Sequence, residues 1–234
     1  MNEELGIRNY VDNHSYLKES VKLYESIDKA VEFIEPLEFP SIEECKALIK
    51  KGVPILQQEE ELQKRITEAI MKFSPRVMES LNTEINETLE RLIKWTIIER
   101  LIPAELKSSE VWDEWLKPYC PVCGRKPILA QLRKQNEGRA RYLKCGGCGT
   151  MWRWNRLGCT YCDNEDLKKM HILETEAEPE MRLDVCDECH SYIKTYTQEG
   201  QENIYLEDWL TLHFDILAEE QGLRKIGSIL IDNA

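Results

Sequence analysis

Cys120-Pro-Val-Cys123 is the first of four CxxC motifs in the second half of the chain. The other three are Cys145-Gly-Gly-Cys148, Cys159-Thr-Tyr-Cys162 and Cys186-Asp-Glu-Cys189. A two-residue spacer lets one tight turn direct two thiolates at the same ion, at about 2.3 Å for zinc. Because two such turns complete a tetrahedron, these motifs predict two tetrathiolate metal sites built from eight of the nine cysteines.

The gaps between the motifs favour pairing them in order. Successive motifs are separated by 21, 10 and 23 residues, and each long gap has room for a pair of strands. Sequential pairing assigns Cys120, Cys123, Cys145 and Cys148 to the first ion, and Cys159, Cys162, Cys186 and Cys189 to the second. An interleaved pairing of the first motif with the third is the alternative, and it requires a cross-braced fold.

Four cysteines per ion restrict the chemistry of each site. Zinc and iron both accept four thiolates in a tetrahedron, so the spacing predicts two metal ions, Fe or Zn, without choosing between them. The cysteines leave no coordination position for water, which predicts a structural or electron-transferring role rather than hydrolysis. Outside the cysteines the sequence contains no HExxH, Walker or nucleophile-elbow motif. We therefore expect no catalytic residue and no enzyme activity.

The composition is that of a folded cytoplasmic protein. The 234 residues are 32% charged and 42% hydrophobic. Residues 1–14 lack the apolar segment of a secretory signal, and no apolar run reaches the roughly 18 residues of a membrane span. We expect a cytoplasmic protein without membrane contact. In that compartment thiols stay reduced, so paired cysteines favour metal binding over disulfides.

Residues 1–117 have the hydrophobic periodicity of helices. Apolar residues at three- and four-residue spacing predict a helix over residues 17–34. Ser41-Ile-Glu-Glu44 predicts a capping box at the start of a short helix. Ser74-Pro75 predicts the start of another helix, running to Pro103, because serine caps helices and proline suits their first turn. The apolar faces of these helices are expected to pack against one another.

The pattern beyond residue 118 changes to short runs typical of β-strands. The runs cover residues 128–133, 139–144, 150–156, 169–173, 181–185 and 192–197. The first two flank Gln135-Asn-Glu-Gly138, which predicts a hairpin turn. The expected fold class is α+β. An all-α domain (1–117) precedes two small tetracysteine β units of the zinc-ribbon type (118–158 and 159–200), and a C-terminal helix with its tail follows (201–234).

The two expected metal units carry opposite charge. Residues 119–158 contain nine basic residues and one acid, a formal charge of +8, whereas residues 163–189 contain ten acids and three bases, a formal charge of −7. The net charge of the whole chain, −12, disfavours nucleic acid as a partner. The basic unit predicts a partner-binding surface that comprises Arg139, Arg141, Trp152, Arg153 and Trp154. Its two tryptophans also suit a strand that packs inward over a metal site, and we favour that position for them.

The order of the motifs resembles that of the formate dehydrogenase accessory protein (FdhE) family. The resemblance rests on Cys120-Pro-Val-Cys-Gly124, on Arg141-Tyr-Leu-Lys-Cys-Gly-Gly-Cys-Gly-Thr150, on the tryptophan-rich run that follows, and on the third and fourth motifs. The stretch Thr211-Leu-His-Phe-Asp-Ile-Leu-Ala-Glu-Glu-Gln-Gly222 resembles the closing helix of that family. The similarity covers residues 118–224 well and the helical half loosely.

The resemblance implies an assembly protein that binds the catalytic subunit of a formate dehydrogenase before that subunit is complete. It also implies rubredoxin-like ribbons that can hold iron on all eight motif cysteines. Asp163 and His190 depart from the family, because a glycine often follows the motif at these positions. A zinc-ribbon module that binds nucleic acid, or a general protein-interaction module, is the alternative function. The oligomeric state stays open.

Overall fold

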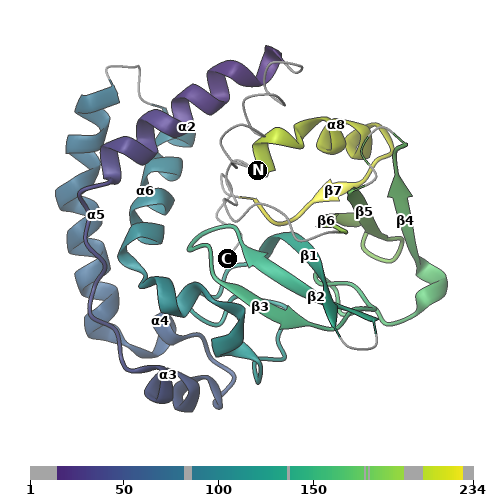
Figure 1. Cartoon of the computed structure of the whole chain (residues 1–234), viewed down its shortest axis with the longest axis horizontal. Coiled ribbons are helices and arrows are strands. Elements are labelled where there is room, and N and C mark those ends of the chain that lie inside the picture. The colour runs from purple at the N-terminus through teal and green to yellow at the C-terminus, as the bar shows by residue number, and fades with distance from the viewer. Residues whose placement is uncertain are drawn as a thin grey trace.

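A layer of helices lies against one end of a twisted β-sheet (Figure 1). The computed structural model describes residues 15–81, 86–135, 138–176, 178, 180–197 and 208–228. Figure 1 shows α2, α5 and α6 side by side on the left, the strands in the centre and on the right, and α8 against the far end of the sheet. The predicted combination of a helical part with β-rich metal units is confirmed.

The helical layer consists of five α-helices and three 3₁₀ turns in the described part of the chain. They are η1 (Ser15–Leu17), α2 (Lys18–Val31), α3 (Ile42–Ile49), α4 (Ile55–Gln58), α5 (Glu60–Leu81), α6 (Glu87–Leu101), η2 (Ala104–Lys107) and η3 (Ser109–Trp112). The predicted capping box is confirmed: the Glu44 N–H donates to Ser41 Oγ, and the Ser41 N–H donates to Glu44 Oε2. Within the described residues, no helix is both long and apolar enough to cross a bilayer.

The predicted helix start at Ser74-Pro75 is wrong. Helix α5 continues through Pro75 to Leu81, although proline removes one backbone hydrogen bond from a helix interior. Its buried face, which includes Ile66 before the proline and Val77 after it, packs against α2 and α6. This continuous packing outweighs the local cost of the proline. The helix that we expected to reach Pro103 in one piece is α6, which begins later, at the Asn86 cap.

The described strands form one seven-stranded sheet. The strands are β1 (Pro127–Gln135), β2 (Gly138–Cys145), β3 (Met151–Trp154), β4 (Met170–Glu174), β5 (Met181–Cys186), β6 (Ser191–Tyr196) and β7 (Arg224–Lys225). The predicted hairpin is confirmed by the β1–β2 pairing, while its turn residues Asn136 and Glu137 lie outside the described residues. The strand order is β3-β2-β1-β6-β5-β4, with β7 beside β6.

The sheet is two similar three-stranded meanders joined edge to edge. Strands β1, β2 and β3 form the first, and β4, β5 and β6 form the second. The joint is the parallel pairing of β1 with β6, which aligns Leu129 with Lys194 and Gln131 with Tyr196. Each meander has the order motif, strand, strand, motif, strand. The chain therefore repeats one metal-ribbon unit and fuses the two copies through their backbones.

The hydrophobic core is shared unequally between the two meanders. The larger cluster runs from the helices into the first meander, and it includes Trp95 of α6, Trp112 of η3 and Trp152 of β3. The smaller cluster lies between the second meander and α8 (Leu212–Glu220), where Phe214 and Ala218 cover Val185. The first ribbon is therefore packed into the helical layer, whereas the second is held mainly by the C-terminal helix.

Candidate metal centres

The first group of cysteines lies between the helical layer and the start of the sheet. It consists of Cys120, Cys123, Cys145 and Cys148, whose sulfur atoms all lie within 4.8 Å of one another. The Sγ atoms of Cys123 and Cys145 are 3.3 Å apart, and those of Cys120 and Cys148 are 3.5 Å apart. In a tetrahedral site with bonds of about 2.3 Å, sulfur atoms lie about 3.8 Å apart. These two separations are slightly shorter than that value, so only a small outward adjustment of the sulfur atoms separates this group from the geometry of a metal site.

The second group has the same arrangement on the other meander. It consists of Cys159, Cys162, Cys186 and Cys189, again with sulfur atoms within 4.8 Å of one another. The Sγ–Sγ distances are 3.6 Å between Cys159 and Cys189, and 3.8 Å between Cys162 and Cys186. Each group contains two consecutive motifs, which is the sequential arrangement, and each could hold one metal ion.

The turns of the two groups are equivalent residue by residue. The residue after each motif has a left-handed backbone, with φ of 81° at Gly124, 73° at Gly149, 58° at Asp163 and 51° at His190. Glycine adopts this region without strain, and aspartate and histidine are among the other residue types enriched there. All four turns therefore share one backbone conformation. His190 is thus a turn residue next to its motif, and the departure from glycine leaves the turn geometry intact.

Hydrogen-bond donors directed at the sulfur atoms fit thiolates bound to a cation. The backbone N–H of Gly147 donates to Cys145 Sγ at 3.3 Å, and that of Tyr161 donates to Cys159 Sγ at 3.3 Å. The hydroxyl groups of Thr150 and Ser191 lie 3.1 and 2.8 Å from Cys148 Sγ and Cys189 Sγ. Such outer hydrogen bonds orient metal ligands and stabilise negative sulfur. Both groups therefore fit a divalent or trivalent ion such as zinc or iron.

The first site is enclosed by α6. An added Cβ at Gly147 would lie 2.8 Å from the Trp95 ring and 2.7 Å from Arg125 Cδ, so only glycine allows the motif to approach the helix. The Arg125 guanidinium lies 4.0 Å from the centre of the Trp95 ring, and its Nη2 donates to the Ser228 carbonyl at 2.6 Å. The site thus joins the helical layer, the sheet and the C-terminal segment.

The second site is more open to solvent. Cys162 is exposed and Cys189 is half-buried, whereas Cys123 is the one half-buried cysteine of the first site. The first motif of the second site is held by Arg141 of the neighbouring meander. This arginine donates to the carbonyls of Asn155 at 2.8 Å and Gly158 at 2.9 Å. The geometry therefore makes the two sites unequal: one lies inside a core and one lies near the surface.

We expect this difference in exposure to produce two rates of metal release. With the anaerobically purified protein and a colorimetric chelator, one metal equivalent should leave quickly and the other slowly, because a chelator reaches Cys162 without opening the core. Cys162→Ser should remove the fast phase and Cys120→Ser the slow phase. Stopped-flow absorbance follows both. A single phase for two equivalents would contradict this prediction.

Of the five residues considered for a partner-binding surface, Arg141 requires correction, while Trp152 has the inward position that we favoured for it. Arg141 and Trp152 are 2% and 0% exposed, so neither is available to a partner. Trp152 donates its indole N–H to the Lys117 carbonyl at 2.9 Å and joins the larger core cluster. Arg141 is buried because it holds the loop before Cys159, and it lies 3.9 Å from Asp184 of β5. Arg139 and Arg153 are exposed, and Trp154 is half-buried.

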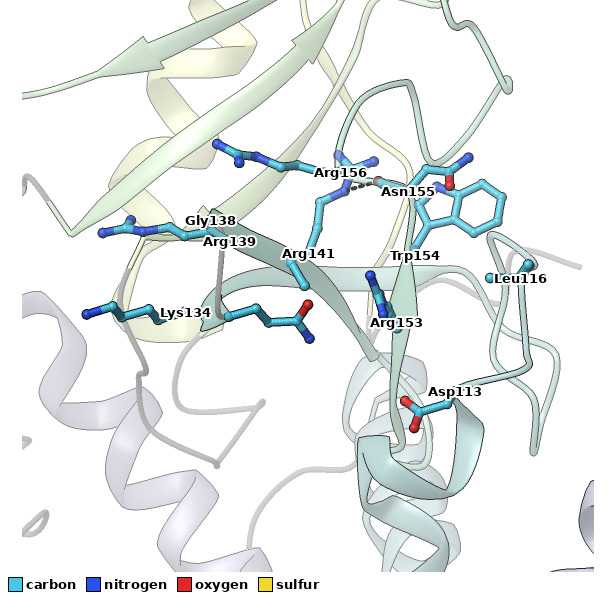
Figure 2. Close-up of a pocket in the computed structure, with 12 residues that line it drawn as sticks. Asp113, Leu116, Lys134, Gly138, Arg139, Arg141, Arg153, Trp154, Asn155 and Arg156 are labelled. Atoms are coloured by element: carbon cyan, nitrogen blue, oxygen red, sulfur yellow. Dashed lines mark hydrogen bonds between the residues drawn. The ribbon is translucent and has the colours of Figure 1, made fainter.

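Arg139, Arg153 and Trp154 line one open groove (Figure 2). Lys134 and Arg156 line it too, and we did not single them out from the sequence. The available signal was the hairpin register, which places Lys134 directly opposite Arg139.

The ninth cysteine, Cys45, lies apart from both metal groups in the helical layer. It is fully buried, and burial raises the pKa of its thiol to about 11, so it is an unreactive core residue.

Comparison with known proteins finds two family models that match the part of the chain with this arrangement. Residues 119–156 match the family model described as FdhE, central domain, and residues 157–231 match the model described as FdhE, C-terminal domain. The boundary between the two models falls between β3 and Cys159, where one meander ends and the next begins.

Individual relatives agree with the family models. The chain is 34% identical over 118 residues to a protein named FdhE homolog from Aquifex aeolicus, a match that covers 49% of this chain and 41% of the relative. It is 28% identical over 131 residues to protein FdhE from Escherichia coli O127:H6, covering 55% and 41%. The matched region thus spans about two fifths of the length of these relatives.

A solved structure extends the likeness of fold to the helical layer. The crystal structure of the FdhE protein from Pseudomonas aeruginosa matches with a TM-score of 0.59 and 19% identity, covering 94% of this chain and 90% of that one. At this identity the match concerns the fold alone. The two adjacent FdhE domain models thus cover the part of the chain that carries the eight motif cysteines, and the whole fold resembles that of an FdhE structure.

Proposed function

We propose that this protein is a non-enzymatic assembly factor of the cytoplasm that binds the catalytic subunit of a formate dehydrogenase during its maturation. The observation that carries the proposal is the match of residues 119–231 to two FdhE domains, which hold both tetracysteine groups. The formate dehydrogenase partner comes from the family resemblance, and the same resemblance implies that binding precedes completion of the subunit.

The geometry of the metal sites supports binding rather than catalysis. Each ion would receive four thiolates from the protein, and a closed tetrahedron offers no position to a substrate or an activated water. When bound, the ions would tie the ends of each meander together and, if they are iron, could exchange one electron. In this proposal the residues of the sheet then present a fixed surface to the client, while the metal sites maintain its shape.

Co-purification tests this function. A tagged form of the protein should retain the catalytic subunit of a formate dehydrogenase from cells that express both, and it should retain the incomplete subunit better than the finished enzyme. An unrelated oxidoreductase subunit of similar size serves as the control client. Equal retention of the control, or no retention of the formate dehydrogenase subunit in either state, would reject the proposal.

A further inference from the structure

An open groove of about 960 Å³ crosses the end of the β1–β2 hairpin and the strand beside it. Figure 2 shows its lining: the side chains of Lys134, Arg139 and Arg156 extend toward the same side, and Trp154 lies next to Leu116. Arg153 of β3 and Asp113 after η3 complete its charged residues, apart from the buried Arg141. The groove therefore presents four exposed cations and one carboxylate.

The register of the hairpin brings like charges together at this groove. Lys134 of β1 is the direct cross-strand partner of Arg139 of β2. Like charges directly opposite one another destabilise a β-pair. A third cation adds to them, because Arg156 Nη1 lies 3.7 Å from the position of a Cβ built on Gly138. The fold thus places three cations close together, and their repulsion lowers the stability of the protein. This arrangement points to an anionic group that binds among them.

These cations have no acidic partner in the described parts of the chain. Lys134, Arg153 and Arg156 form no ion pair or side-chain hydrogen bond there, and Arg139 donates to the uncharged carbonyl of Thr197. Glu137, in the hairpin turn, lies outside the described residues. In a protein with a net charge of −12, the described residues of the groove thus form a local basic surface in which four exposed cations face the single carboxylate of Asp113.

The other end of the groove is apolar. Leu116, which is 64% exposed, lines this end together with the half-buried Trp154, and Leu157, which is 61% exposed, lines the depression next to it. A second depression of about 190 Å³ shares Leu116, Trp154 and Asn155 with the groove and reaches Cys159 of the second metal site. A ligand in the groove therefore meets cations first and aliphatic surface next.

We propose that this groove docks an acidic, extended segment of the client polypeptide, with its carboxylates among Lys134, Arg139 and Arg156 and an apolar side chain against Leu116 and Leu157. The inference rests on the proposed function and adds to it the surface that would bind the client. Carboxylates form charge-assisted hydrogen bonds with guanidinium groups, and aliphatic rims receive peptide side chains. A nucleic acid would fit worse, because bases need exposed aromatic platforms, whereas the aromatic residue that lines this groove, Trp154, is half-buried beside an exposed leucine.

Fluorescence anisotropy of labelled peptides tests the groove. The probe is a synthetic glutamate-rich peptide with one central phenylalanine. The control peptide has the same sequence with every glutamate replaced by glutamine. Lys134→Glu with Arg156→Glu should weaken binding of the glutamate peptide by about tenfold or more at low salt, since two attractions become repulsions. Neither side chain has a structural partner among the described residues. The milder Lys134→Gln with Arg156→Gln should give an intermediate loss.

The control variant is Lys46→Glu with Lys64→Glu, which makes the same change in net charge on exposed positions of α3 and α5. It should bind the probe nearly as the wild type does, or a little less tightly through its overall charge. Equal weakening in both variants would overturn the proposal. So would equal binding of the glutamine peptide, or tighter binding of a single-stranded oligonucleotide of matched charge, which would reveal a nucleic-acid surface instead.

Client capture with the same variants separates the two proposals. If the wild type and the groove variant retain the formate dehydrogenase subunit equally, the groove is not the docking site, while the proposed function stands. If the wild type retains no client at all, the proposed function fails regardless of peptide binding. Loss of retention in the groove variant alone, with unchanged metal content, supports both.

Discussion

A serine in place of Cys148 is expected to release one of the two metal ions and to destabilise the whole helical layer. Cys148 is fully buried, and its metal group lies within the larger core cluster, against Trp95 of α6. Loss of a structural metal is among the few single changes that cost more than about 4–5 kcal/mol. A domain has only about 5–15 kcal/mol to lose, so the helices should melt at a much lower temperature.

Metal analysis and thermal melts followed by circular dichroism measure both consequences. Cys45→Ser is the matched control, since Cys45 is equally buried, lies outside both metal groups and hydrogen-bonds the Pro40 carbonyl at 3.3 Å, as a serine can. It should keep two ions and lose little stability. Cys162→Ser should lose one ion but leave the helical melt nearly unchanged, because the second site has its own small core. Equal melts for Cys148→Ser and Cys162→Ser would refute the unequal roles of the sites.

The second large effect is expected from Lys194→Met, inside the second meander. Lys194 has no exposed surface, and its ammonium group donates to the Asp208 carbonyl at 2.9 Å and to Asp215 Oδ2 at 3.0 Å. Lys194 also pairs with the Asp208 carboxylate at 2.5 Å, and Lys225 contacts the carboxylates of Asp208 and Asp215 at 2.7 and 2.8 Å. Methionine would leave the buried Asp208 and the half-buried Asp215 with one cation, and loss of one partner of a buried pair costs about 3–5 kcal/mol. The contact between α8 and the sheet should loosen first.

The pH dependence of this variant follows from the carboxylates. Burial by itself would raise the pKa of Asp208, but Lys194 and Lys225 outweigh burial and hold that pKa below its usual value. In Lys194→Met one of the two cations is gone, and we expect burial to raise the pKa of Asp208 above its value in the unfolded chain, so that protonation favours the folded state. Denaturant titrations should therefore show a smaller deficit relative to wild type at pH 5 than at pH 8.

A double variant tests the electrostatic reason for the effect. Lys194→Met with Asp208→Asn removes one charge of each sign and leaves Lys225 with Asp215, so it should recover part of the lost stability at pH 8. If the second substitution instead adds its full cost to the first, the destabilisation of Lys194→Met comes from lost packing rather than from an unpaired buried charge.

Local chemistry explains most of what could be predicted. The motif spacing, the capping box at Ser41 and the hairpin at Gln135–Gly138 all depend on atoms a few residues apart, so the sequence shows them directly. Ser74-Pro75 is the opposite case, because the local preference for a helix start is real but the buried face of α5 continues across it. The basic segment around Arg141 predicted a surface, yet burial of this arginine could not be read from its charge.

The sequence alone predicted the eight cysteines of the two candidate metal sites, their grouping into ribbon units and the resemblance to the FdhE family, because these follow from residue types at fixed short separations. Only the tertiary structure decided that the ribbons share one sheet through β1 and β6, and that one site lies in the core and the other near the surface. It also decided which cations of the basic segment gather in a groove. These features depend on register and packing between segments far apart in the chain, where the free energy comes from shared burial and backbone pairing rather than from local preference.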